Sequence, residues 1–73
     1  MTDMRRCGAH VLLLPDGTRL EQAVVEIVED RVVNYYEFRN ELPMTVWLGG
    51  EIRVEFDEDG NRRALWNGKR INS

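Results

Sequence analysis

Apolar and polar residues alternate with a period of two along most of this chain, a pattern typical of β-strands rather than helices. The alternation is complete in Glu51–Phe56, where Ile52, Val54 and Phe56 are expected to face a core and the charged residues between them to face water. Residues 11–14, 23–28 and 32–38 are apolar on both sides. Such segments are expected to be either central strands or strands with a face that a partner covers.

Turn-forming residues divide the sequence into short segments at roughly even spacing. The most specific signal is Asn67-Gly68, because a type I′ turn needs a positive φ at both central residues, and it predicts a terminal hairpin over residues 63–71. Gly49-Gly50 predicts either a turn or a bulge that bends one long strand. Further breaks are predicted at residues 15–18, 29–31, 39–43 and 57–60.

Together these patterns predict an all-β fold, either a small β-sandwich or an open β-barrel of about six short, mainly antiparallel strands. We expect residues 1–73 to form a single β domain in which residues 1–7 are disordered or frayed. Residues 19–30 also fit the spacing of an amphipathic helix. Their valines and the hairpin spacing around them favour a strand instead.

A chain of 73 residues has little room for a core, so an additional source of stability is expected. Cys7 is the only cysteine, which excludes an intramolecular disulfide. Cys7 and His10 are also too few to hold a structural zinc ion, and no metal or cofactor is predicted. Self-association is the remaining usual source of stability for so small a chain.

The charge balance is mildly acidic, with 13 Asp and Glu against 10 Lys and Arg. Such a balance gives no overall attraction for nucleic acid or anionic lipid. No segment has the length and apolar character of a signal peptide or a membrane span. Together with the single thiol, this predicts a cytoplasmic protein that does not associate with a membrane.

Catalytic motifs are not evident, and we predict that the chain is not an enzyme. Cys7 and His10 could form a nucleophile and base, but residues three apart on a strand point to opposite faces. Gly49-Gly50 is not followed by the Lys and helix start of a phosphate loop. Residues 57–60 lack the spaced ligands of a calcium loop, and a surface turn is expected there.

The leading functional prediction is protein–protein association, as a homodimer or by docking on a larger partner, because the chain carries more apolar strand face than it can cover alone. Aromatic side chains dominate binding hot spots. The candidate interface residues are Tyr35, Tyr36, Trp47 and Trp66.

Binding of single-stranded nucleic acid through the hairpin of residues 61–71 is the alternative prediction. Small β-barrels bind single strands by combining stacking aromatics with cations. The residues that would carry this function are Arg62, Arg63, Trp66, Lys69 and Arg70. The overall acidity and the acids at residues 57–59 oppose it, so nucleic acid is not the expected partner.

Residues 9–36, with a weaker continuation over residues 47–54, resemble the N-terminal β-strands of the amidohydrolase superfamily. The similarity lies in Leu14-Pro15-Asp16-Gly17-Thr18 and in the segment from Val25 to Val33. The resemblance implies a β-sandwich module like the one beside the catalytic barrel of those enzymes. The chain continues into residues 52–57 without the family's His-x-His pair, so no metal ligand is carried over.

Overall fold

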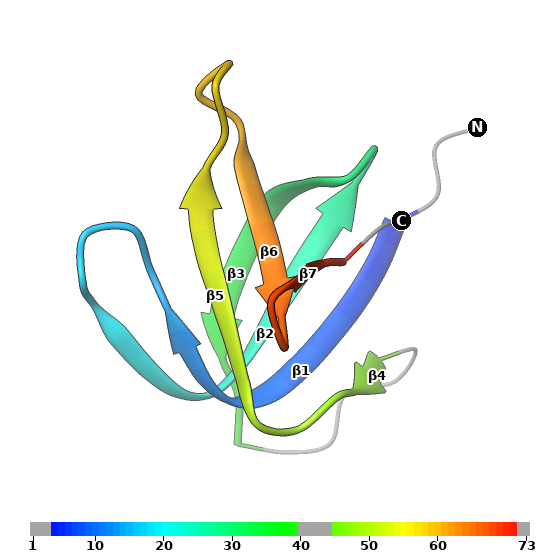
Figure 1. Cartoon of the computed structure of the whole chain (residues 1–73). Helices are drawn as coiled ribbons and strands as arrows, with labels where there is room; N and C mark the ends of the chain where they lie inside the picture. The colour runs from blue at the N-terminus through cyan, green and yellow to red at the C-terminus, as the bar shows by residue number, and fades with distance from the viewer. Residues whose placement is uncertain (1–3, 40–44, 72–73) are drawn as a thin grey trace.

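The computed structural model describes residues 4–39 and 45–71 and contains seven β-strands within them (Figure 1). They are β1 (Met4–Leu13), β2 (Arg19–Val28), β3 (Arg31–Glu37), β4 (Thr45–Trp47), β5 (Glu51–Phe56), β6 (Arg62–Trp66) and β7 (Lys69–Arg70). The all-β prediction is therefore confirmed, and residues 19–28 form a strand. The described residues include no helix that is long and apolar enough to cross a membrane.

All seven strands belong to one open, mixed sheet with the order β3-β2-β1-β5-β6-β7, and β4 also pairs with β1. β1 is antiparallel to β2 but parallel to both β4 and β5. The sheet is strongly curved, and the β5–β6 hairpin crosses in front of β1, β2 and β3 (Figure 1). A bond from the Arg63 guanidinium to the Asp30 carbonyl ties β6 to the β2–β3 turn. The curvature thus creates an enclosed interior within a single sheet.

The aliphatic core lies between the β1–β3 layer and the β5–β6 hairpin. Its buried members are Cys7, Ala9, Leu12, Ala23, Val25, Ile27, Val32, Ile52, Val54, Ala64 and Ile71. Ala9 and Leu12 both belong to it although they are three residues apart, so the strict alternation of β1 is interrupted between them. On the neighbouring strand Gln22 has a φ of 48°, which marks the same irregularity in β2.

The predicted tight turns at both ends of the chain are confirmed. Asn67 and Gly68 have φ values of 55° and 79°, as a type I′ turn requires, and Trp66 pairs with Lys69 across them. Residues 15–18 connect β1 to β2, and residues 29–30 connect β2 to β3. The predicted break at residues 39–43 lies largely outside the described residues.

Gly49 and Gly50 form a bulge rather than a hairpin turn. β1 advances three residues from Gly8 to Val11 while the neighbouring chain advances four from Trp47 to Glu51, so the neighbouring chain contains one extra residue. Backbone bonds from Leu48 to Gly8 and from Val11 to Gly50 keep the two chains together across the bulge. β4 and β5 therefore behave as one bent strand beside β1, the second of the two predicted alternatives.

Two sequence-based expectations need correction. Phe56 was expected in the core but is 61% exposed, because it is the last residue of β5, at the turn end of the β5–β6 hairpin, and lines an open hollow there. Residues 4–7 were expected to be frayed, yet β1 begins at Met4 because the second half of β2 supplies its pairing partner. The seven strands agree with the prediction of about six that pair mainly in antiparallel fashion, although β4 and β5 lie parallel to β1 and although β1 and β2 have ten residues each.

Aromatic side chains of the chain itself cover part of the outer face of β1 and β2. One cross-strand row runs over four strands through Trp47, Gly8, Val24 and Tyr36. Val24 is fully buried although it lies outside the aliphatic core. The Trp47 ring meets the rings of His10 and Phe38 edge-on, with centroids 5.0 and 5.8 Å apart. The chain thus covers part of its second apolar face itself.

Candidate interaction surfaces

Among the residues that the structure describes, the large apolar side chain with the greatest exposure lies at the turn end of the β5–β6 hairpin. Phe56, at 61% exposure, and Val33, at 49%, line the same hollow of about 440 Å³. The hollow is also lined by Arg31, Val32, Gly60, Asn61 and Arg62. We call these seven residues the Phe56 surface. Exposed apolar side chains that are grouped in this way, rather than scattered singly, mark interaction sites.

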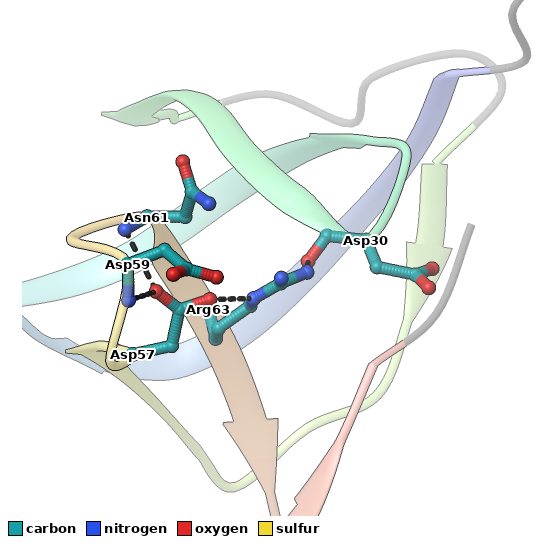
Figure 2. A network of polar contacts seen from close by, with 5 residues as sticks. All are labelled: Asp30, Asp57, Asp59, Asn61 and Arg63. Carbon is teal, nitrogen blue, oxygen red and sulfur yellow. Dashed lines mark hydrogen bonds and ion pairs between the residues drawn. The ribbon is translucent and has the colours of Figure 1, made fainter.

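A polar network holds the loop beside the Phe56 surface in place (Figure 2). One Asp57 carboxylate oxygen accepts bonds from the backbone N–H groups of Asp59 and Asn61, both at 2.9 Å. The other accepts a 2.7 Å bond from Arg63, which also donates to the Asp30 carbonyl at 2.6 Å. The bond from Arg63 and the two backbone bonds lower the pKa of Asp57. The loop is therefore preorganised against the β2–β3 turn.

Charges of both signs border the Phe56 surface. Arg62 lies 5.5 Å from the centre of the Tyr35 ring, and Arg31 is paired with Glu29 in an exposed contact of 2.9 Å. Glu58 and Asp59 are exposed in the loop that carries Gly60 and Asn61. The surface thus combines apolar side chains with two arginines, and two exposed acids lie in the loop that contributes to it.

A second surface lies alongside β7, where cations border an apolar floor. The groove has a volume of about 370 Å³. Its cations are Arg5, Lys69 and Arg70, and its floor is formed by Leu48, Trp66 and Ile71. Trp66 is held in place by a 2.9 Å bond from its indole N–H to the Gly49 carbonyl. We call this the β7 groove. It is the place where the terminal hairpin meets the start of β1.

The four aromatic residues predicted as interface anchors are not brought together. Tyr35 packs against the aliphatic core, and Tyr36 lies in the outer cross-strand row. Trp47 is half-exposed on the outer face, whereas Trp66 packs against the core and lines the β7 groove. No common aromatic patch unites these four side chains.

The five residues predicted to bind nucleic acid divide into two groups. Trp66, Lys69 and Arg70 meet in the β7 groove. Arg62 lies over Tyr35, and Arg63 is engaged with Asp57 and Asp30. Arg62, Ala64 and Trp66 alternate onto one face of β6, and that face is turned toward the interior, where Ala64 is buried. The hairpin therefore does not present one continuous basic and aromatic strip.

The geometry does not bring Cys7 and His10 together as a nucleophile and base. Cys7 is a fully buried free thiol of the core, whereas His10 is exposed on the outer face beside Trp47. Burial raises the pKa of the Cys7 thiol, although the nearby Arg5 opposes this effect. Within residues 4–39 and 45–71 no three His, Cys, Asp or Glu side chains are grouped so that they could hold a metal ion.

Glu26 is the most enclosed carboxylate of the outer face. It accepts bonds from Arg6 at 3.0 Å and from the Tyr36 hydroxyl at 3.0 Å. Burial alone would raise the pKa of Glu26, but the Tyr36 and Arg6 bonds outweigh it and the pKa is lowered. The pKa of Tyr36 is raised by burial and by its bond to this carboxylate. These contacts join β1, β2 and β3 and give Glu26 a structural role.

Sequence reasoning did not assign Phe56, Val33, Arg5 or Leu48 to an interaction surface. Phe56 was assigned to the core, and Val33 was not singled out within its apolar segment. Phe56 lies directly before the turn at residues 57–60, and this position at the end of a strand was a signal that its side chain could stay exposed. Arg5 and Leu48 enter the β7 groove only because β1 and the bulge lie beside β7, and their sequence positions give no signal of this.

A scan against protein-family models finds no match to this chain, and searches of curated proteins and of solved structures find none either. The resemblance to the N-terminal strands of amidohydrolases therefore stays a prediction.

Proposed function

We propose that this chain is a non-catalytic protein-association module that forms a homodimer through the Phe56 surface. The observation that carries the proposal is the shared exposure of Phe56 and Val33 in one hollow, next to a loop that is already fixed by the Arg63–Asp57 contact. A preordered surface loses little conformational entropy on association. The proposed setting is the reducing cytoplasm, in which a buried single thiol such as Cys7 stays free.

The charge pattern favours a second copy of this chain as the partner. In a twofold interface each copy presents the same surface, so the surface must complement itself. The Phe56 surface has arginines on one side, with Glu58 and Asp59 in its loop. Two copies related by a twofold axis would place the acidic loop of one against Arg31 of the other, with the two Phe56 rings at the centre.

Sedimentation equilibrium over a range of concentrations tests this proposal. The expected mass is that of two chains for the unchanged protein and of one chain for Phe56→Ser, because a polar residue at the centre of the interface removes its main apolar contact. Val46→Ser is the matched control, since Val46 is 46% exposed but does not line this hollow. Circular dichroism checks that both variants stay folded. A mass of one chain for the unchanged protein at high concentration would refute the proposal.

A charge exchange tests the predicted orientation. Arg31→Glu and Asp59→Arg are each expected to weaken the homodimer, because each places like charges opposite one another. An equimolar mixture of the two variants is expected to regain the two-chain mass. Dimers that persist unchanged in both single variants would contradict the twofold arrangement.

A further inference from the structure

We infer that the β7 groove binds an extended peptide segment in which an apolar residue is flanked by Asp or Glu. This site is separate from the Phe56 surface, and the inference does not depend on dimerisation.

The electrostatic part of the argument is the sign of the charges around the groove. Arg5, Lys69 and Arg70 come from opposite ends of the chain, and within residues 4–39 and 45–71 no Asp or Glu side chain lines the groove with them. The hollow on the outer side of the β5–β6 hairpin is different, because there Arg53 lies between Glu51 and Glu55. A chain with a net charge of −3 thus has a local basic site. Screening confines the effect of the distant acids, since the Debye length is about 8 Å at physiological salt.

The floor of the groove supplies the apolar part of the argument. Leu48 and Trp66 are partly buried against the core, and Ile71 is 7% exposed. The bond from Trp66 to the Gly49 carbonyl fixes the indole ring, so the floor is already formed before a ligand arrives. A fixed aromatic ring beside aliphatic side chains is a good contact for an apolar residue.

The backbone of β7 indicates why the ligand is an extended chain. β7 pairs with β6 through Trp66 with Lys69 and through Leu65 with Arg70. Trp66 and Lys69 close the two-residue turn as a hydrogen-bonded pair, so Leu65 and Arg70 form the following non-hydrogen-bonded pair. The N–H and C=O of Arg70 consequently point away from β6. They lie on a strand edge to which a peptide can add, and its side chains can then reach the floor and the cations.

A peptide fits these features better than single-stranded nucleic acid. A polyanion needs a longer line of cations, and Arg62 and Arg63, the next ones along the hairpin, are engaged with Tyr35 and with Asp57. The acids of residues 57–59 also lie beyond Arg62 and would repel a continuing phosphate chain. A short acidic and apolar segment needs only the three groove cations and the floor.

Fluorescence anisotropy with a labelled peptide of sequence GDLEVDG tests the inference. We expect saturable binding at low salt that weakens by about tenfold or more in Lys69→Glu/Arg70→Glu, because the reversed charges repel the peptide. The control is Arg53→Glu, which reverses an exposed cation outside the β7 groove and is expected to leave the affinity unchanged. The monomeric variant Phe56→Ser is expected to bind the peptide as well as the unchanged protein does.

Two further sets of measurements distinguish this inference from its alternatives. On peptide addition, the Arg70 amide is expected to shift in a ¹⁵N–¹H spectrum and to become protected from hydrogen exchange, because it gains a backbone partner. Equal binding of the basic peptide GKLKVKG, an unchanged affinity in the double variant, or a labelled oligothymidine that binds more tightly than the acidic peptide would each overturn the inference.

Discussion

β1 and β2 bury their two faces by different means. On the inner face, Ala9, Val25 and Ile27 are fully buried by aliphatic packing against the β5–β6 hairpin. On the outer face, Gly8 and Val24 lie in one row with Trp47, which is itself 47% exposed. The comparison shows that strands with two apolar faces do not require a partner on both. A single large ring beside a glycine covers part of the second face, while its own outer side remains in water.

The inner face is expected to respond most strongly to the loss of volume. Ile27→Ala should lower the free energy of unfolding by about 2–5 kcal/mol, because it removes buried methyl groups and leaves a cavity. Urea denaturation measures the loss. Val46→Ala is the control, and truncation of its half-exposed side chain, which lies outside the Phe56 surface, should cost only about 0.5 kcal/mol or less.

If Ile27→Ala does not fold, Ile27→Val provides the same test on a smaller scale, with an expected loss of about 0.5–1.5 kcal/mol. Equal losses at Ile27 and at Val46 would contradict the assignment of Ile27 to the packed interior.

The outer face is expected to respond to added volume. A Cβ atom on Gly8 would lie 2.8 Å from Cε3 of Trp47, so the ring would have to move. Gly8→Ala should therefore lower the free energy of unfolding by about 1–3 kcal/mol, although alanine is ordinarily the better residue within a strand. Urea denaturation of the variant measures this change.

A double-mutant cycle identifies the cause of the Gly8→Ala effect. In a Trp47→Ala protein the ring is absent, and the added Gly8→Ala change should then cost almost nothing. An undiminished cost in that background would mean that the contact with Trp47 is not the reason for the glycine.

The acid response is expected to be the smallest effect, and it comes from the polar network rather than from either face. The pKa of Asp57 is lowered from its ordinary value of 3.8 in the folded state, chiefly by Arg63. A lowered carboxyl pKa stabilises the fold above the unfolded-state value, and this contribution is lost as the pH falls through the folded-state value. Urea denaturation from neutral pH to below 3.8 should show the loss.

Asp57→Asn should remove this part of the pH dependence, and Arg63→Gln should reduce it. Glu55→Gln is the control, because this exposed carboxylate lies on β5 outside the Asp57 contacts and outside the Phe56 surface. A steeper acid response in Asp57→Asn than in the unchanged protein would show that the sign of the shift is wrong.

Local signals in the sequence were sufficient for most turns and for the strand type. Asn67-Gly68 needs two positive φ values, and the period of two in residues 51–54 needs only the neighbours along the chain. The position of Phe56 could not be predicted in the same way. Its alternation is perfect, but burial also requires side chains packed over the ring, and Phe56 instead lines an open hollow that it shares with Val32 and Val33.

The candidate surfaces were only partly predictable for the same reason. Trp66, Lys69 and Arg70 were singled out together because they lie on one hairpin, and they do meet in the β7 groove. Arg5 lies more than sixty residues away in the sequence. It reaches the same groove because of the order of the strands in the sheet, which local sequence patterns do not predict. Arg63 was a candidate residue of the alternative nucleic-acid site. In the structure its guanidinium instead donates to the Asp57 carboxylate and to the Asp30 carbonyl within the fold.

The sequence by itself determined that this protein is built from β-strands, where most of its tight turns lie, and that residues 23–28 are apolar on both sides. These properties depend on the backbone preferences of single residues and on the spacing between near neighbours. Only the tertiary structure decided which strands lie parallel to β1, that Trp47 covers Gly8, and that Phe56 remains in water. Those outcomes depend on contacts between residues far apart in the chain, which form only when the sheet curves back on itself.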